Sequence, residues 1–101
     1  MKNLGYGSET ILVTDAAASA VLHYAAVLAH TGGGDVVDVP TCDEYGVAAT
    51  ASVVLGPGIP VLATNASDDL SEDDDPDFVQ ELTRRVALAL AGVPSHRPGG
   101  A

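Results

Sequence analysis

Residues 10–39 read TILVTDAAASAVLHYAAVLAHTGGGDVVDV, and this stretch alone predicts three elements of secondary structure. Residues 10–14 are apolar and rich in β-branched side chains, which is typical of a strand buried on both faces. Residues 16–31 are rich in Ala, Leu and Val and contain neither Gly nor Pro, which favours a helix. In residues 35–41 Val alternates with Asp, as in a strand with one solvent-facing side. We therefore expect a βαβ unit with parallel strands and a right-handed crossover.

The predicted helix has clear signals at both ends and one apolar face. Asp15 is a good N-cap residue, and the glycines at 32–34 accept the left-handed conformation that ends helices. Ser19 and the histidines at 23 and 30 are expected on the side that faces solvent. The side chains expected to face the core recur at helical spacing and are Ala17, Val21, Tyr24, Ala25 and Leu28.

The second half of the chain adds two strands and another helix. Residues 47–55 alternate in character and predict a strand, preceded by a hairpin loop at 42–46. A Gly-Pro-Gly turn separates this strand from another at 59–64. Pro76, with Asp75 before it as N-cap, begins a helix that is expected to reach residue 91. Its expected features are an i, i+4 ion pair of Glu81 with Arg85 and an apolar stripe of Phe78, Val79, Leu82, Val86 and Leu90.

The element order βαβββα predicts an α+β fold. Because the later strands are joined by short loops, we expect them to be antiparallel, in a mixed four-stranded sheet with both helices on one face. Residues 10–91 would form this single domain. Residues 1–9 and 92–101 contain Gly or Pro and no apolar pattern, so we expect both segments to be flexible.

The charge balance argues against two classes of partner and is compatible with a third. The chain has 14 Asp and Glu residues against 4 Lys and Arg residues, a net charge of −10. Phosphate backbones and anionic membranes are bound by clustered basic side chains, so we expect binding to neither nucleic acid nor membrane. The acidic balance suits either plain solubility, with a solvated acidic loop, or a basic protein partner. The expected contact residues are the exposed aromatic Tyr45 and the acidic segment of Asp68, Asp69, Glu72, Asp73, Asp74 and Asp75.

The composition also indicates a compartment and an oligomeric state. Cys42 is the single cysteine, so no disulfide can form within the chain, as in proteins of a reducing compartment. We see no signal peptide and no apolar run long enough to span a bilayer, and we expect a cytoplasmic protein. The apolar residues are mostly Ala and Val, which bury little area each. We therefore expect the chain to gain stability as a homodimer.

The sequence predicts neither a metal site nor a catalytic site. His23 and His30 are seven residues apart, which places their backbones about 10 Å apart along a helix, too far to share one ion. Cys42 lies beside two carboxylates, which should keep its thiol protonated. The acidic segment lacks the spacing of a calcium-binding loop. We therefore expect no cofactor or metal and assign no catalytic residue.

Asp15 is the strongest candidate for a small-molecule contact, with Ser19 one helical turn later. It lies where the carboxyl end of a strand meets the start of a helix, and α/β sheets bind ligands at this edge. Residues 11–20 and the Gly-Asp-Val-Val-Asp-Val stretch at 34–39 resemble the opening of universal stress proteins. That resemblance implies a nucleotide in contact with Asp15. The remaining chain departs from the family, because it lacks a second crossover helix and a phosphate loop of the family type.

The function that these features favour is a non-enzymatic protein-interaction or regulatory module. Two alternatives stay open. One is a small nucleotide-binding protein with its site at Asp15, and the other is a small enzyme whose site lies between two subunits. Salt-sensitive binding to a basic protein would support the module, a nucleotide-dependent thermal shift would support the first alternative, and a dimer with titratable groups in its cleft would support the second.

Overall fold

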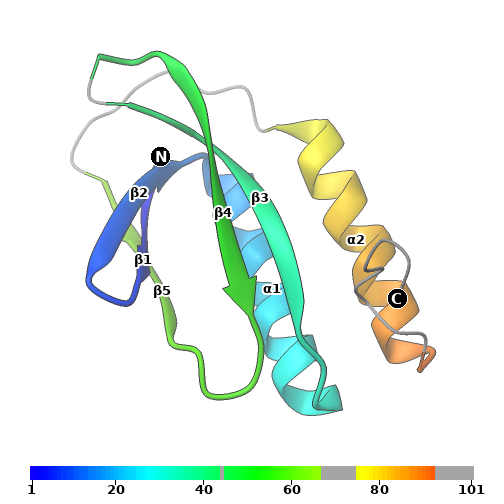
Figure 1. The fold of residues 1–101 in the computed structure, drawn as a ribbon. Coiled ribbons are helices and arrows are strands. Elements are labelled where there is room, and N and C mark those ends of the chain that lie inside the picture. Colours follow the sequence, from blue (N-terminus) through cyan, green and yellow to red (C-terminus); the bar gives the residue numbers. More distant parts are fainter. Residues whose placement is uncertain (44, 67–74, 93–101) are drawn as a thin grey trace.

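The computed structural model describes residues 1–43, 45–66 and 75–92 of the chain. It confirms a small α+β fold in which two helices accompany antiparallel strands (Figure 1). All the predicted helices and strands are present, and one further strand precedes them. In chain order the elements are β1 (Lys2–Tyr6), β2 (Glu9–Val13), α1 (Asp15–Thr31), β3 (Asp35–Cys42), β4 (Ala48–Leu55), β5 (Val61–Asn65) and α2 (Pro76–Leu90).

The strands form two antiparallel sheets, not the single mixed four-stranded sheet expected from the sequence. In one sheet β1 lies between β2 and β5, and in the other β3 pairs with β4 as a hairpin. β2 and β3, the expected parallel partners, lie near each other without forming a ladder, and the Thr41 hydroxyl donates to the Leu12 carbonyl oxygen at 2.5 Å. The expectation is wrong because each of these strands is paired instead with the strand to which a short turn joins it.

The start of the chain forms β1, whereas the sequence predicts a flexible segment. Gly7, with φ of 62°, makes the tight turn that joins β1 to β2. Leu4 is 1% exposed and lies between Ile11 of β2 and Ala63 of β5. Leu4 and Tyr6 both pack on the core, and two such residues are too few to give a visible alternation in the sequence. β1 also changes the strand order, because it pairs with β5 in the place expected for β4.

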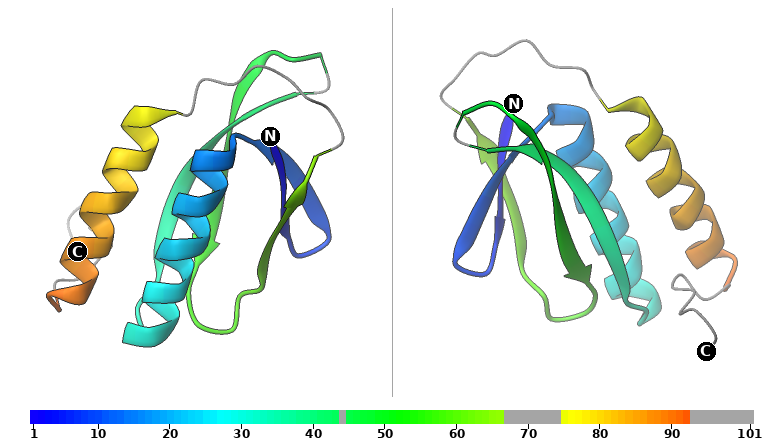
Figure 2. Two further views of the ribbon diagram at one scale, coloured as in Figure 1. Left: turned by 180° about the vertical axis from the view of Figure 1, so that it is seen from behind. Right: turned by 45° about the horizontal axis from the view of Figure 1, so that its top comes forward.

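The core lies between the strands and α1, and α2 packs beside α1 (Figure 2). As predicted, Gly32 ends α1 in the left-handed conformation and Leu82 of α2 is buried. Leu90 is 63% exposed, contrary to the prediction, and Ala89 is buried in its place. A strict four-residue spacing drifts around a helix of 3.6 residues per turn, so the stripe leaves the contact face by residue 90. The buried residues of α1 match the predicted inner face closely and are Ala17, Ala18, Val21, Tyr24 and Leu28.

A buried polar cluster joins the start of β3 to both helices. Asp35 is 4% exposed, and its Oδ2 accepts a hydrogen bond from the Tyr24 hydroxyl of α1 at 2.5 Å. The same oxygen lies 3.0 Å from Nη1 of Arg85 in α2, and the backbone N–H of Val36 donates to Oδ1 at 2.8 Å. Because a buried carboxylate is costly unless it is paired, these contacts hold α2 against β3.

Glu81 binds the two arginines of α2. The predicted ion pair is confirmed, since Nε of Arg85 lies 2.8 Å from Oε2 of Glu81. Arg84 also donates to this carboxylate, from Nε at 3.0 Å and from Nη2 at 2.8 Å. Hydrogen bonds from Arg84 and then Arg85 lower the pKa of Glu81 from its ordinary 4.5 to about 2. Both arginines are therefore engaged by acidic groups of their own chain.

Candidate functional site

The start of α1 is capped by Thr14, and the prediction that Asp15 is the N-cap is wrong. Thr14 has extended backbone angles, and its Oγ1 accepts a hydrogen bond from the backbone N–H of Ala17 at 3.1 Å. Asp15 is already the first residue of the helix. Both residue types cap helices well, and the strand ends one residue earlier than the sequence indicates. Asp15 is 58% exposed at the helix start, where its Oδ1 lies 3.2 Å from the amino group of Met1.

The Thr14 hydroxyl also joins the starts of the two helices. It donates to Oδ2 of Asp75 at 3.1 Å. Asp75 occupies the predicted N-cap position of α2, but its φ is 46° and its side chain forms no hydrogen bond with the start of its own helix. Its carboxylate is instead directed to the start of α1. The one member of the acidic segment that the structure describes therefore has a structural role.

A small cavity lies where these helix starts meet the ends of β2 and β3. Its volume is about 170 Å³. Cys42 is the last residue of β3 and is half-buried there. The lining residues that carry polar or charged groups are Met1 with its amino terminus, Thr14, Thr41, Cys42 and Asp75. Neither residue predicted to bind a small molecule lines this cavity: Asp15 is not among its lining residues, and Ser19 lines a separate hollow.

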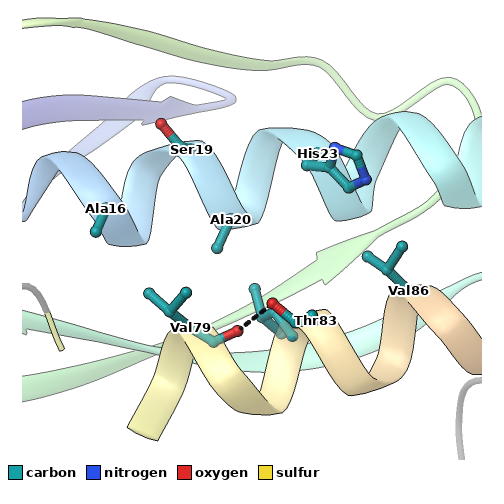
Figure 3. A pocket seen from close by; sticks show the side chains of 8 residues that line it. Ala16, Ser19, Ala20, His23, Val79, Thr83 and Val86 are labelled. Atoms are coloured by element: carbon teal, nitrogen blue, oxygen red, sulfur yellow. Dashed lines mark hydrogen bonds between the residues drawn. The ribbon is translucent and has the colours of Figure 1, made fainter. Parts of the chain in front are cut away.

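That second hollow is a groove of about 480 Å³ between α1 and α2. Figure 3 shows Ala16 and Ala20 of α1 directed toward α2, with Val79 and Val86 of α2 directed toward α1. Ser19 points away from α2 in this view. Ala16 and Ala20 are too small to fill the space between the helices, so a groove remains at this level, and most of its lining residues are apolar.

The hairpin of β3 and β4 closes with the predicted tight turn. The Asp43 carboxylate accepts hydrogen bonds from the backbone N–H groups of Tyr45 at 2.8 Å and Val47 at 2.9 Å. The Asp43 N–H donates to the carbonyl oxygen of Val47 at 2.9 Å, and Gly46 adopts a φ of 80°. Tyr45, a predicted partner contact, lies at the tip and is 82% exposed.

The two edges of β4 differ in their hydrogen bonding. Val47 directs its backbone groups toward Asp43, on the side of β3. In an antiparallel ladder this direction alternates along a strand, so Ala48, Thr50, Ser52 and Val54 direct their groups to the opposite edge. The other end of β4 agrees with this assignment. There the Tyr6 hydroxyl accepts from the N–H of Val54 at 3.1 Å and donates to its carbonyl oxygen at 2.8 Å.

Three residues of this edge lack a ladder partner within the part of the chain that the structure describes: Ala48, Thr50 and Ser52. All three are exposed. Edge strands that stay unpaired usually carry Pro or charged residues such as Lys. Residues 48–55 contain none of these. Sequence reasoning missed this edge because it paired residues 59–64 with β4. The absence of blocking residues was the one signal available.

Exposed apolar side chains lie at both ends of the same hairpin. Tyr45 is 82% exposed, Val47 59%, Val54 47% and Val36 45%. Val36 and Val54 lie opposite each other at the open end of the ladder, and Tyr45 and Val47 lie at the turn, at the other end. Single exposed apolar residues are common on surfaces, and these two pairs flank the unpaired edge at its two ends.

The acidic segment contributes little to the described surface. Asp68, Asp69, Glu72, Asp73 and Asp74 lie outside the described residues. Each described Lys and Arg has a partner within the chain: Lys2 donates to Asn65, and Arg84 and Arg85 bind Glu81. The exposed cations are thus engaged, which leaves the described surface without a basic cluster.

Comparisons with protein families, with curated proteins and with solved structures found no match to this chain. The resemblance of residues 11–39 to universal stress proteins therefore has no support from the family comparison. Among the described residues, no three His, Cys, Asp or Glu side chains lie close enough to hold a metal ion. Neither helix of the described chain has the length and apolar character needed to cross a membrane.

Proposed function

We propose that this chain is a protein-interaction module that binds by adding a strand to the free edge of β4. The observation that carries the proposal is the row of exposed backbone groups at Ala48, Thr50 and Ser52, directed away from β3. Exposed edges bind extended polypeptides through the same hydrogen bonds that form a sheet. The apolar side chains of Tyr45, Val47 and Val54 would add buried area to the contact.

The cavity at the helix starts and the groove between the helices favour contact over chemistry. The cavity at the helix starts, at about 170 Å³, lies below the roughly 300–1,000 Å³ typical of small-molecule sites. Its wall holds one acidic residue, Asp75, and one cationic residue, Met1, whose amino group already pairs with Asp15. In the larger groove, Ser19 and His23 lie one turn apart without a hydrogen bond between them, so neither is an activated nucleophile.

The charge of the chain limits the kind of partner. A net charge of −10, with the described cations already engaged, supports a protein partner over a polyanion. The acidic segment stays a predicted contact for a basic protein, at a place separate from the β4 edge. Neither contact needs a cofactor.

A comparison of three immobilised proteins tests the proposal: the native chain, Thr50→Pro and Thr83→Tyr. Proline at position 50 removes an N–H that has no ladder partner in the described chain, so the fold should survive, as circular dichroism would verify. Tyr at position 83 fills the helix groove and leaves the edge intact. We expect the proteins captured by the native chain, which include further copies of the chain, to be captured by Thr83→Tyr as well. Thr50→Pro should no longer capture them.

Two results would contradict the proposal. Loss of binding with Thr83→Tyr but not with Thr50→Pro would transfer the contact to the helix groove. A thermal shift with millimolar ATP that disappears in Asp15→Ala would support a nucleotide-binding protein instead.

A further inference from the structure

We propose that the strand added to β4 is β4 of a second copy of this chain, antiparallel to the first and related to it by a two-fold axis at Thr50. The inference rests on the proposed function, because it names the partner of the same edge. A two-fold axis makes the same residues serve on both sides of the contact. The edge must therefore be complementary to itself.

The hydrogen-bonding groups of the edge have this symmetry. Ala48 and Ser52 lie at equal distances on either side of Thr50, and all three direct their backbone groups outward. In an antiparallel pair centred on Thr50, Thr50 meets its own equivalent, and Ala48 meets Ser52 of the second copy. Each of these opposed pairs exchanges both N–H···O bonds. Every unpaired group of the row thereby finds a partner.

The contacts of Val54 set the limit of this pairing. In the same register Val54 would lie opposite Gly46 of the second copy, which is in the hairpin turn and not in a strand. Val54 would then need another partner, and the Tyr6 hydroxyl already supplies one to both its N–H and its carbonyl oxygen. The chain thus satisfies internally the one outward residue of β4 that the second copy cannot reach.

The charge distribution of the edge permits a second copy. Two copies each of charge −10 repel each other, and this repulsion is smallest where they meet through uncharged surface. Residues 48–55 carry no ionisable side chain, so this edge permits close approach. The nearest carboxylate across the hairpin, Asp38, accepts a hydrogen bond from the Ser52 hydroxyl at 2.6 Å. A basic strand would find no carboxylate within the edge itself to recognise.

An exposed apolar residue of the hairpin also fits this pairing. Counted from the axis at Thr50, Val47 lies opposite Val53 of the second copy. Val47 is 59% exposed in the single chain and would gain a neighbouring strand in the pair. The two-fold therefore covers the exposed Val47 at both ends of the contact.

Disulfide trapping tests the register directly. In a Cys42→Ser background, Thr50→Cys should cross-link to itself, since opposed bonded residues lie about 5.5 Å apart between Cα atoms, within the range of a disulfide. Ser52→Cys alone should not cross-link, because its equivalents lie about 13 Å apart at roughly 3.4 Å per residue. A mixture of Ala48→Cys with Ser52→Cys should cross-link to each other.

Sedimentation and native mass spectrometry of the uncross-linked protein complete the test. We expect a concentration-dependent dimer whose dissociation constant rises at least about tenfold in Thr50→Pro. A monomer at all concentrations would overturn the second copy as partner, while the Thr50→Pro comparison with captured proteins would still decide the proposed function. A dimer that persists in Thr50→Pro, or that cross-links through Ser52→Cys alone, would also overturn the inference.

Discussion

The start of β3 and the outer edge of β4 differ in how their polar groups are bonded. At the start of β3, the buried Asp35 carboxylate is bonded by groups from β3, α1 and α2. Along the far edge of β4, backbone groups at Thr50 and its neighbours face solvent. No buried side-chain nitrogen or oxygen among the described residues lacks a partner. The buried polar side chains of the described residues are therefore all hydrogen-bonded. The unpaired backbone groups of β4 lie at the surface, where a partner can bind them.

The largest effect on stability should come from removing a partner of the buried Asp35 carboxylate. Arg85→Met leaves Asp35 buried without its cation, and we expect the free energy of unfolding to fall by about 3 kcal/mol. Arg84→Met is the matched control, because Arg84 is 60% exposed and solvent screens its pair with Glu81, so this change should cost much less. Urea unfolding measures both. Equal losses in the two variants would mean that the Asp35 cluster does not hold α2.

Thr14→Ala should have the next largest effect, because it removes the cap of α1 and the hydroxyl that binds Asp75. We expect a loss of about 1–2 kcal/mol in the free energy of unfolding. Asp15→Ala, which removes an exposed ion pair and a favourable charge at the helix start, should cost about half as much or less. Thermal unfolding followed by circular dichroism would rank them. The reverse order would restore Asp15 as the cap.

Tyr6→Phe sharpens the comparison at the edge itself. Without the hydroxyl, the backbone groups of Val54 lose their partner, and stability should fall by about 1 kcal/mol. The free edge also lengthens to include Val54, so a second copy can pair in a register centred on residue 51, with Thr50 opposite Ser52. We expect a mixture of Thr50→Cys with Ser52→Cys to cross-link to each other in Tyr6→Phe and not in the native background. Tyr45→Phe serves as the control and should leave the cross-linking unchanged.

The smallest expected effect is the pH dependence of stability that comes from Glu81. The pKa of Glu81 is about 2 in the folded chain and about 4.5 when unpaired, so its contribution is present above pH 4.5 and is lost as the pH falls toward 2. Because Glu81 is 39% exposed, this contribution should stay within about 1 kcal/mol. Urea unfolding of Glu81→Gln against the native chain should show a difference at pH 7 that shrinks below pH 4.5. A difference independent of pH would contradict the pairing.

Local patterns predicted the elements well, because their causes lie within each segment. The inner face of α1 follows from helical spacing, and the hairpin turn follows from Asp43 and Gly46. The choice between Thr14 and Asp15 as cap was less predictable, since both are suitable and the end of the strand decides between them.

The strand order, and with it the candidate site, was not predictable from local patterns. β1 carries only Leu4 and Tyr6 toward the core, yet its pairing with β5 removes the partner expected for β4. Pairing between strands distant in sequence depends on the whole chain, so the free edge appears only in three dimensions. The predicted acidic site cannot be compared in the same way, because residues 68–74 lie outside the described chain.

Amide hydrogen exchange along β4, resolved by residue and measured at two protein concentrations, tests the free edge most directly. At low concentration we expect Ala49, Ala51 and Val53 to be protected by β3, and Ala48, Thr50 and Ser52 to exchange fast. At high concentration the second group should become protected as copies pair. Protection of Thr50 in the dilute protein would show that the edge is already occupied within the chain, and fast exchange at every concentration would show that no second copy binds it.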